Sequence, residues 1–181
     1  MEHPILFSTT MVKAILDDRK SMTRRVVKWP VRGYRDSYKT RLHLEDELPR
    51  EYDKIVKACP YGQVGSRLWC KETFCHTDLG VIYKADMDDA DMRLFVSYRK
   101  WKPSIFMPRK FSRITLEITN VRVEHLQEIK LEDCWDEGIR SRAESRIPDF
   151  KRLWDSINAK RGYGWVSNPF CWVIEFKVVQ R

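Results

Sequence analysis

The segment at residues 17–28 constrains the fold of this chain most, because it joins a predicted helix to a predicted strand through one short basic turn. Ser8, Thr9 or Thr10 can cap the helix at its N-terminus. After the turn, residues 23–27 are rich in β-branched side chains, which is typical of a strand. Before it, apolar side chains recur at the i, i+3, i+4 spacing of one buried helical face, at Met11, Val12, Ile15 and Leu16.

The turn carries polar groups that are suited to binding or chemistry. Such a turn can hold an anion, orient a nucleobase, or host a reaction centre built on a threonine and a lysine. The residues alone leave these three uses open. Five cations and two hydroxyls stand in the turn, at Arg19, Lys20, Ser21, Thr23, Arg24, Arg25 and Lys28.

The net charge of +8 is concentrated in the same part of the chain. Between Lys13 and Arg41, ten Lys or Arg stand against three Asp or Glu, whereas the rest of the chain has twenty-four against twenty-three. A clustered excess of this kind is typical of proteins that bind a polyanion, most often a nucleic acid. A basic surface that serves only solubility is an equally good interpretation of the charge alone.

Short strands and few helices follow along the chain. Residues 112–126 predict one bent strand or two strands that break near Asn120, and residues 103–109 predict an extended segment. Further strands are expected at Pro4–Phe7, Arg67–Glu72, Val81–Tyr83 and Trp172–Val179. Short strands with a few helices indicate an α+β fold that is mainly β, a small β-barrel with helices packed at its rim.

Two helices are expected in the C-terminal half of the chain. The first spans residues 131–137 and ends where Gly138 takes the C′ position. The second opens with Pro148 in its first turn. Its predicted buried face consists of Phe150, Leu153, Trp154 and Ile157.

At 181 residues the chain is expected to form one domain with surface insertions. One insertion is predicted at about residues 30–58, where a basic half is followed by an acidic half without periodic pattern. A shorter insertion is predicted at about residues 85–102. No apolar run approaches the roughly 20 residues of a membrane span, and no signal peptide is visible. We therefore expect a cytoplasmic protein, without membrane contact, whose five cysteines stay reduced.

A series of short motifs stands in a fixed order along the chain, at Pro4–Phe7, Arg19–Arg25, Cys59–Gly62, Arg67–Trp69, Met107–Arg109, Ser112–Leu116, Glu137–Gly138, Trp154–Asn158 and Trp172–Phe176. Taken in this order, they resemble the ASCH domain of the PUA-like superfamily, and in particular its longer phage and prophage branch. The resemblance implies a PUA-like barrel and a cleft that recognises RNA or a modified nucleotide. A protein of that branch would act in the cytoplasm of the bacterial host.

One branch of this family is an amidohydrolase that removes the acetyl group from N(4)-acetylcytidine, and other relatives are proposed to bind or cleave RNA. The catalytic set of the amidohydrolase falls on Lys20, Thr23 and Glu137 of this sequence. Gly65–Ser66 stands where relatives commonly have Gly-Asp, and Phe106 stands where a histidine often precedes the Met-Pro-Arg motif. These departures lie at the edge of the implied cleft.

Hydrolysis by this set would require Lys20 to lose its proton. Lowering the pKa of a lysine from about 10.4 to about 7 costs about 4.6 kcal/mol. Burial and the neighbouring arginines favour this shift, whereas pairing with Glu137 opposes it. A structural ion pair, ligand binding without catalysis, and catalysis are three open interpretations of Lys20, Thr23 and Glu137.

Aromatic and cationic residues outside the turn add binding candidates. Tyr61 and Trp69 are predicted to stack on bases, because both flank the turn at residues 62–66. Arg109 is predicted either to contact phosphate or to pair with acidic residues in the region 128–137. The spacing of Cys70, Cys75 and His76 fits no standard zinc site, so we expect no metal and no cofactor.

Three functions remain as hypotheses. The first is binding of RNA or a modified nucleoside or nucleotide by the residues Arg19, Ser21, Arg24, Arg25, Tyr61, Trp69 and Arg109. The second is a hydrolase, either an amidohydrolase that uses Lys20, Thr23 and Glu137 or a ribonuclease. The third is a phage interaction protein whose basic insertion binds a protein partner.

Overall fold

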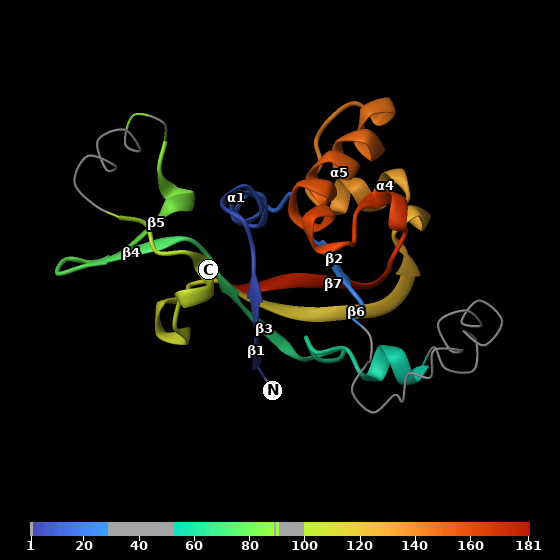
Figure 1. Cartoon of the computed structure of the whole chain (residues 1–181). Coiled ribbons are helices and arrows are strands. Elements are labelled where there is room, and N and C mark those ends of the chain that lie inside the picture. The colour runs from blue at the N-terminus through green and yellow to red at the C-terminus, as the bar shows by residue number, and fades with distance from the viewer. Residues whose placement is uncertain (1, 29–52, 89, 91–99) are drawn as a thin grey trace.

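The computed structural model describes residues 2–28, 53–88, 90 and 100–181. Its five-stranded sheet has the order β1-β3-β6-β7-β2 (Figure 1). Only β1 and β3 run parallel, and the other neighbours are antiparallel. The strands are β1 (Glu2–Leu6), β2 (Met22–Val26), β3 (Arg67–Lys71), β6 (Thr115–His125) and β7 (Phe170–Gln180).

Two short strands, β4 (Phe74–Thr77) and β5 (Gly80–Tyr83), form a separate antiparallel hairpin. The five-stranded sheet has β1 at one edge and β2 at the other. A side chain links these edges, because Arg25 Nη2 donates a hydrogen bond to the carbonyl of Leu6 at 2.7 Å. The expected α+β class with mainly β structure is therefore confirmed.

Helices α1 (Thr9–Leu16), α4 (Leu131–Asp136) and α5 (Ala143–Asn158) complete the framework, and residues 53–57 are also helical. Figure 1 shows α4 and α5 together on one side of the sheet, next to β2 and β7. Ser8 caps α1 as expected, with its hydroxyl accepting from the Met11 amide. Within the described residues, no helix is long and apolar enough to cross a membrane.

Two apolar clusters hold these elements together. The larger one lies between α1 and the sheet and includes Ile15, Leu68, Leu116 and Ile174, each with an exposed fraction of 0%. The smaller one joins α4 and α5 to the sheet and consists of Leu126, Ile129, Cys134, Phe150, Trp154 and Cys171. Helix α4 therefore packs against both α5 and β2, the strand that follows the basic turn.

Two expectations for the central part of the chain need correction or refinement. Within residues 112–126, Thr115–His125 form one strand, β6, whose register shifts between Ile118 and Asn120, close to the expected break. Residues 103–109 are not simply extended, because short 3₁₀ turns form at Ser104–Phe106 and Arg109–Phe111. Each of these turns directly follows a proline, whose fixed φ suits the start of a turn.

The expectation for the start of the last helix was wrong. Helix α5 begins at Ala143, and Pro148 lies inside it. An interior proline costs about 3 kcal/mol, because it lacks a backbone donor and crowds the preceding turn. Phe150 and Trp154 offset that cost by packing into the smaller apolar cluster. Ile157, which was also expected on the buried face, is 45% exposed.

The predicted insertions fall largely outside the described residues, at 29–52, 89 and 91–99. The described end of the first insertion belongs to the core, because Ile55 is buried and its carbonyl accepts from Trp172 Nε1 at 3.3 Å. Ala85, at the start of the second insertion, is also buried. The single-domain organisation stays a prediction.

Candidate functional site

Lys20 and Glu137 form a buried ion pair. Lys20 Nζ lies 2.7 Å from Glu137 Oε2, and the exposed fractions of the two side chains are 1% and 6%. The same ammonium donates to the Glu137 backbone carbonyl at 2.9 Å. Glu137 Oε1 accepts no hydrogen bond within the described residues, although Arg24 Nη1 lies 3.6 Å away. One carboxylate oxygen is thus held, and the other can accept from a ligand.

The backbone around this pair is fixed from three directions. The Ser21 amide donates to the Asp136 carbonyl, and the Phe176 amide donates to the Ser21 carbonyl. Gly138 follows with φ +92°, and a Cβ at this position would lie 3.2 Å from the Cβ of Ala14. Glycine therefore permits the tight passage between α4 and the basic turn.

Burial lowers the pKa of Lys20 below its ordinary value, and the charges of Arg25 and Arg24 act in the same direction. The charge of Glu137 and its hydrogen bond oppose this effect without reversing it. For the pKa of Lys20, desolvation by burial therefore outweighs the attraction of Glu137, a competition that the sequence left open. A lysine in such surroundings gives up its proton more readily than an exposed lysine.

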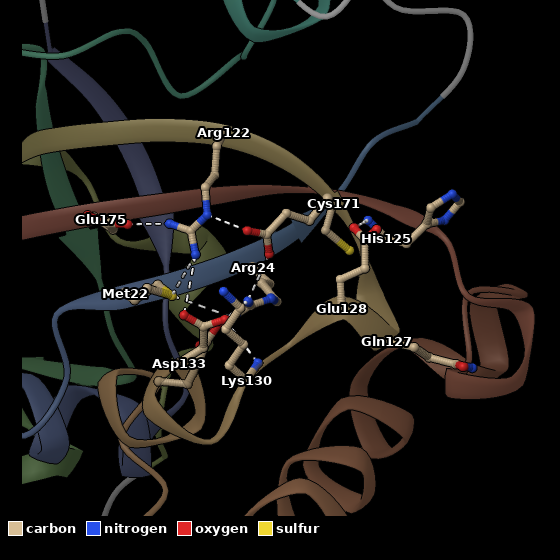
Figure 2. Close-up of polar contacts among 12 residues, drawn as sticks. Met22, Arg24, Arg122, His125, Gln127, Glu128, Lys130, Asp133, Cys171 and Glu175 are labelled. Carbon is tan, nitrogen blue, oxygen red and sulfur yellow. Dashed lines mark hydrogen bonds and ion pairs between the residues drawn. The ribbon is translucent and has the colours of Figure 1, made fainter. Parts of the chain in front are cut away.

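Arg24 is buried on β2 next to Thr23. Its guanidinium contacts Asp133 at 2.7 Å and Glu124 at 3.1 Å. Arg122 also reaches Asp133, at 3.3 Å, and Figure 2 shows the two arginines converging on this carboxylate beside Met22. Arg24 is thus held within a network of charges that joins β2, β6 and α4.

A pocket of about 410 Å³ opens beside the ion pair, a size that suits a small ligand. Lys20, Thr23, Arg24 and Glu137, all buried, lie in its wall. The Thr23 hydroxyl has no hydrogen-bond partner within the described part of the chain. Aromatic side chains in the wall belong to Phe7, Tyr61, Trp154 and Tyr163.

The three residues of the implied catalytic set therefore converge on one pocket, together with three predicted binding residues, Arg24, Arg25 and Tyr61. The Arg25 guanidinium lies 5.1 Å from the centre of the Phe7 ring, and its buried Nε has no hydrogen-bond partner in the described chain. Whether these residues bind or catalyse stays a prediction.

Four other predicted residues do not line this pocket, which lies beside Lys20 and Glu137. Arg19 pairs with Asp17 at 2.7 Å, and Ser21 uses its backbone to join β7 and α4. Trp69 lies beside Lys71 and Arg109, and Arg109 itself pairs with Glu2 at 2.9 Å.

Several lining residues were not recognised as candidates from the sequence. They come from the C-terminal end of α5 and the turns after it, at Asn158, Arg161 and Tyr163. Trp154 was assigned to the core, and it is both buried and part of the wall; its Nε1 donates to the Tyr163 carbonyl at 2.7 Å. The motif at residues 154–158 marked this region, but a local pattern does not show which helix faces a distant turn.

No protein-family model and no curated protein matches this chain. Among solved structures, a DUF984 protein from Enterococcus faecalis V583 is similar with a TM-score of 0.49 and 8% identity, over 99% of this chain and 82% of that chain. An ASCH domain from Lactobacillus crispatus JV V101 gives a TM-score of 0.44 and 13% identity, over 99% and 80%. The second of these structures is of the family that the sequence motifs resemble. At these TM-scores and identities, the likenesses add no argument about the site.

Proposed function

We propose that the pocket binds a nucleobase of RNA or of a modified nucleotide. The observation that carries this proposal is the convergence of buried polar groups with aromatic and cationic side chains in one pocket. Lys20, Thr23 and Glu137 offer a donor, a hydroxyl and a carboxylate oxygen to the edge of a base. Tyr61 offers an aromatic face, and such faces stack on bases.

Two arginines of the basic turn, Arg25 and Arg19, provide a matched test of this proposal. Arg25 lines the pocket, whereas Arg19 belongs to the same basic segment but pairs with Asp17 away from it. Binding of labelled single-stranded RNA would be followed by fluorescence anisotropy at two salt concentrations, with N(4)-acetylcytidine and cytidine as competitors. We expect salt-sensitive, saturable binding that Arg25→Gln weakens and Arg19→Gln does not. Absence of saturable binding, or equal losses in both variants, would contradict the proposal.

A second candidate function is hydrolysis of an acylated nucleobase, as the ASCH resemblance implies. It is favoured by the lowered pKa of Lys20 beside Thr23 and Glu137. In this reaction the oxygen of water, or first of Thr23, bonds to the acyl carbon while neutral Lys20 takes the proton. The C–N bond then breaks, and the amine nitrogen leaves with the proton that Lys20 returns. Where Thr23 attacked first, water then hydrolyses the acyl-threonine ester and restores the Thr23 hydroxyl.

Two substitutions at Thr23 separate binding from hydrolysis. Thr23→Val keeps the shape of the side chain and removes the hydroxyl, whereas Thr23→Ser keeps the hydroxyl. A hydrolase would lose at least about a hundredfold in turnover of N(4)-acetylcytidine in the valine variant only, as chromatography of the cytidine product would show. A wild-type protein that binds the nucleoside and releases no cytidine would exclude this substrate for catalysis.

A further inference from the structure

The described wall of the pocket carries far more positive than negative charge. Glu137 is its one acidic residue, and five lysines or arginines stand against it: Lys20, Arg24, Arg25, Lys28 and Arg161. A pocket lined in this way attracts an anion, because the low-dielectric walls strengthen the field of the cations.

Three of these cations form no ion pair with the residues that the structure describes. Lys20 pairs with Glu137, and Arg24 pairs with acidic side chains on β6 and α4. Within the described residues, no ion pair involves Arg25, Lys28 or Arg161. Three arginines elsewhere on the framework, Arg109, Arg113 and Arg122, do form ion pairs. The pocket therefore holds three cations that form no ion pair within the described residues.

Burial separates the floor of the pocket from its rim. Lys20, Thr23 and Glu137 are buried, whereas Lys28 and Arg161 are exposed and lie in the same wall. Lys28 stands five residues beyond Thr23 in the chain, two of them past the end of β2, and at about 3.3 Å per residue a fully extended chain covers at most about 16 Å over this distance. Such a span leaves room for a base on the floor, a ribose, and a phosphate at the rim.

We propose that Lys28 and Arg161 bind a phosphate group of the ligand, so that the pocket takes a nucleotide or a unit of an RNA chain in preference to a free nucleoside. This inference rests on the proposed function and assigns the ligand class at the same site. The planar guanidinium of Arg161 can donate two parallel hydrogen bonds to a phosphate, and Lys28 adds a point charge. The unpartnered Nε of Arg25 is a further donor in the same wall.

The test compares one base with and without phosphate. Calorimetric titrations at low salt would use N(4)-acetylcytidine, its 3′- and 5′-monophosphates, and a short single-stranded RNA. We expect the better monophosphate to bind at least about tenfold more tightly than the nucleoside. Lys28→Gln and Arg161→Gln should reduce this difference. Lys160→Gln is the matched control, because Lys160 is exposed next to Arg161 and does not line the pocket.

The outcomes distinguish this inference from the proposed function. Equal affinities for the nucleoside and both monophosphates would overturn the phosphate assignment and leave base binding intact. A phosphate preference that survives in both Gln variants would also overturn the assignment to Lys28 and Arg161. Failure of RNA, nucleotides and nucleoside alike to bind would overturn the proposed function itself. A preference for 3′- over 5′-phosphate, or for RNA over both, would show which phosphate of a chain these residues hold.

Discussion

Lys20 contacts Glu137 twice, because its ammonium donates to carboxylate Oε2 at 2.7 Å and to the backbone carbonyl of the same residue at 2.9 Å. The basic turn is thereby tied both to the charge of Glu137 and to the backbone at the end of α4. A substitution of the Glu137 side chain removes the charge and leaves the carbonyl contact. The electrostatic part of the pair can therefore be measured separately.

Removing either member of this pair should destabilise the protein. Glu137→Gln leaves the Lys20 ammonium buried without its counter-charge, and we expect a loss of about 3–5 kcal/mol in the free energy of unfolding. Lys20→Met should cost less, since Arg24 remains 3.6 Å from Glu137 Oε1. The double variant should lose less than the sum of the two losses. Urea unfolding of the four proteins measures the coupling, and strictly additive losses would show that the pair is not energetically linked.

The lowered pKa of Lys20 predicts a specific dependence of stability on pH. Between the folded pKa and the unfolded value of about 10.5, the unfolded chain binds a proton at Lys20 that the folded chain has released. The contribution of Lys20 to stability should therefore rise with pH through this window and be lost as pH falls through the folded pKa. Lys20→Met removes this contribution, so the difference in unfolding free energy between wild type and variant should grow toward pH 10.5. A difference that is constant with pH would contradict the shift.

Asp133 should be a stabilising residue despite its place near the surface. Its carboxylate accepts from Arg24 at 2.7 Å, from Arg122 at 3.3 Å, and from the Lys130 amide at 3.1 Å. Asp133→Asn should therefore cost about 2–4 kcal/mol, because the buried guanidinium of Arg24 and the half-buried one of Arg122 lose charge compensation. Glu132→Gln is the matched control, since Glu132 is exposed in the same turn and should cost only about a few tenths of a kcal/mol. Thermal or urea unfolding compares the two, and equal small losses would contradict a stabilising network.

The sequence was sufficient for local features and insufficient for the partners of buried charges. The periodicity around Ile15 predicted α1 correctly, and the glycine at position 138 predicted the end of α4 correctly. Each of these signals depends only on residues that are close together in the sequence. Lys20 and Glu137 are 117 residues apart, and only the family resemblance brought them together. No local pattern indicates that Arg24 meets Glu124 and Asp133, since that contact depends on how α4 docks against the sheet.

Pro148 shows the opposite failure, in which a valid local preference was outweighed by tertiary packing. Proline favours the first turn of a helix, and this preference placed the start of α5 too late in the chain. Burial of Phe150 and Trp154 stabilises a longer helix that tolerates the proline in its interior. The same burial turns Ile157 toward the pocket side, where it was not expected.

Gly138 should be intolerant of a side chain for two separable reasons. Its φ of +92° is unfavourable for an L residue, and a Cβ would lie 3.2 Å from the Ala14 Cβ and 3.4 Å from the Lys20 Cβ. Gly65→Ala isolates the first reason, because Gly65 has φ +83° and nothing within 4 Å of the added carbon. We expect Gly65→Ala to cost about 1–2 kcal/mol and Gly138→Ala to cost about 1–3 kcal/mol more. Unfolding by urea gives both values, and equal costs would argue against close packing of α1 on the site.

Tyr61 and Trp69 were both predicted to stack on bases, and the structure separates them. Tyr61 lines the pocket, whereas Trp69 lies outside it, with Lys71 Nζ at 5.4 Å from its ring. Loss of one stacking ring typically costs about 1–3 kcal/mol of binding free energy. Tyr61→Leu should therefore weaken RNA binding about tenfold to a hundredfold, while Trp69→Leu should leave it unchanged. Anisotropy titrations at constant salt compare the RNA affinities of the two variants, after unfolding curves have shown that both variants are folded. A larger loss in the Trp69 variant would place the binding surface on the β3 side of the sheet and away from Lys20 and Glu137.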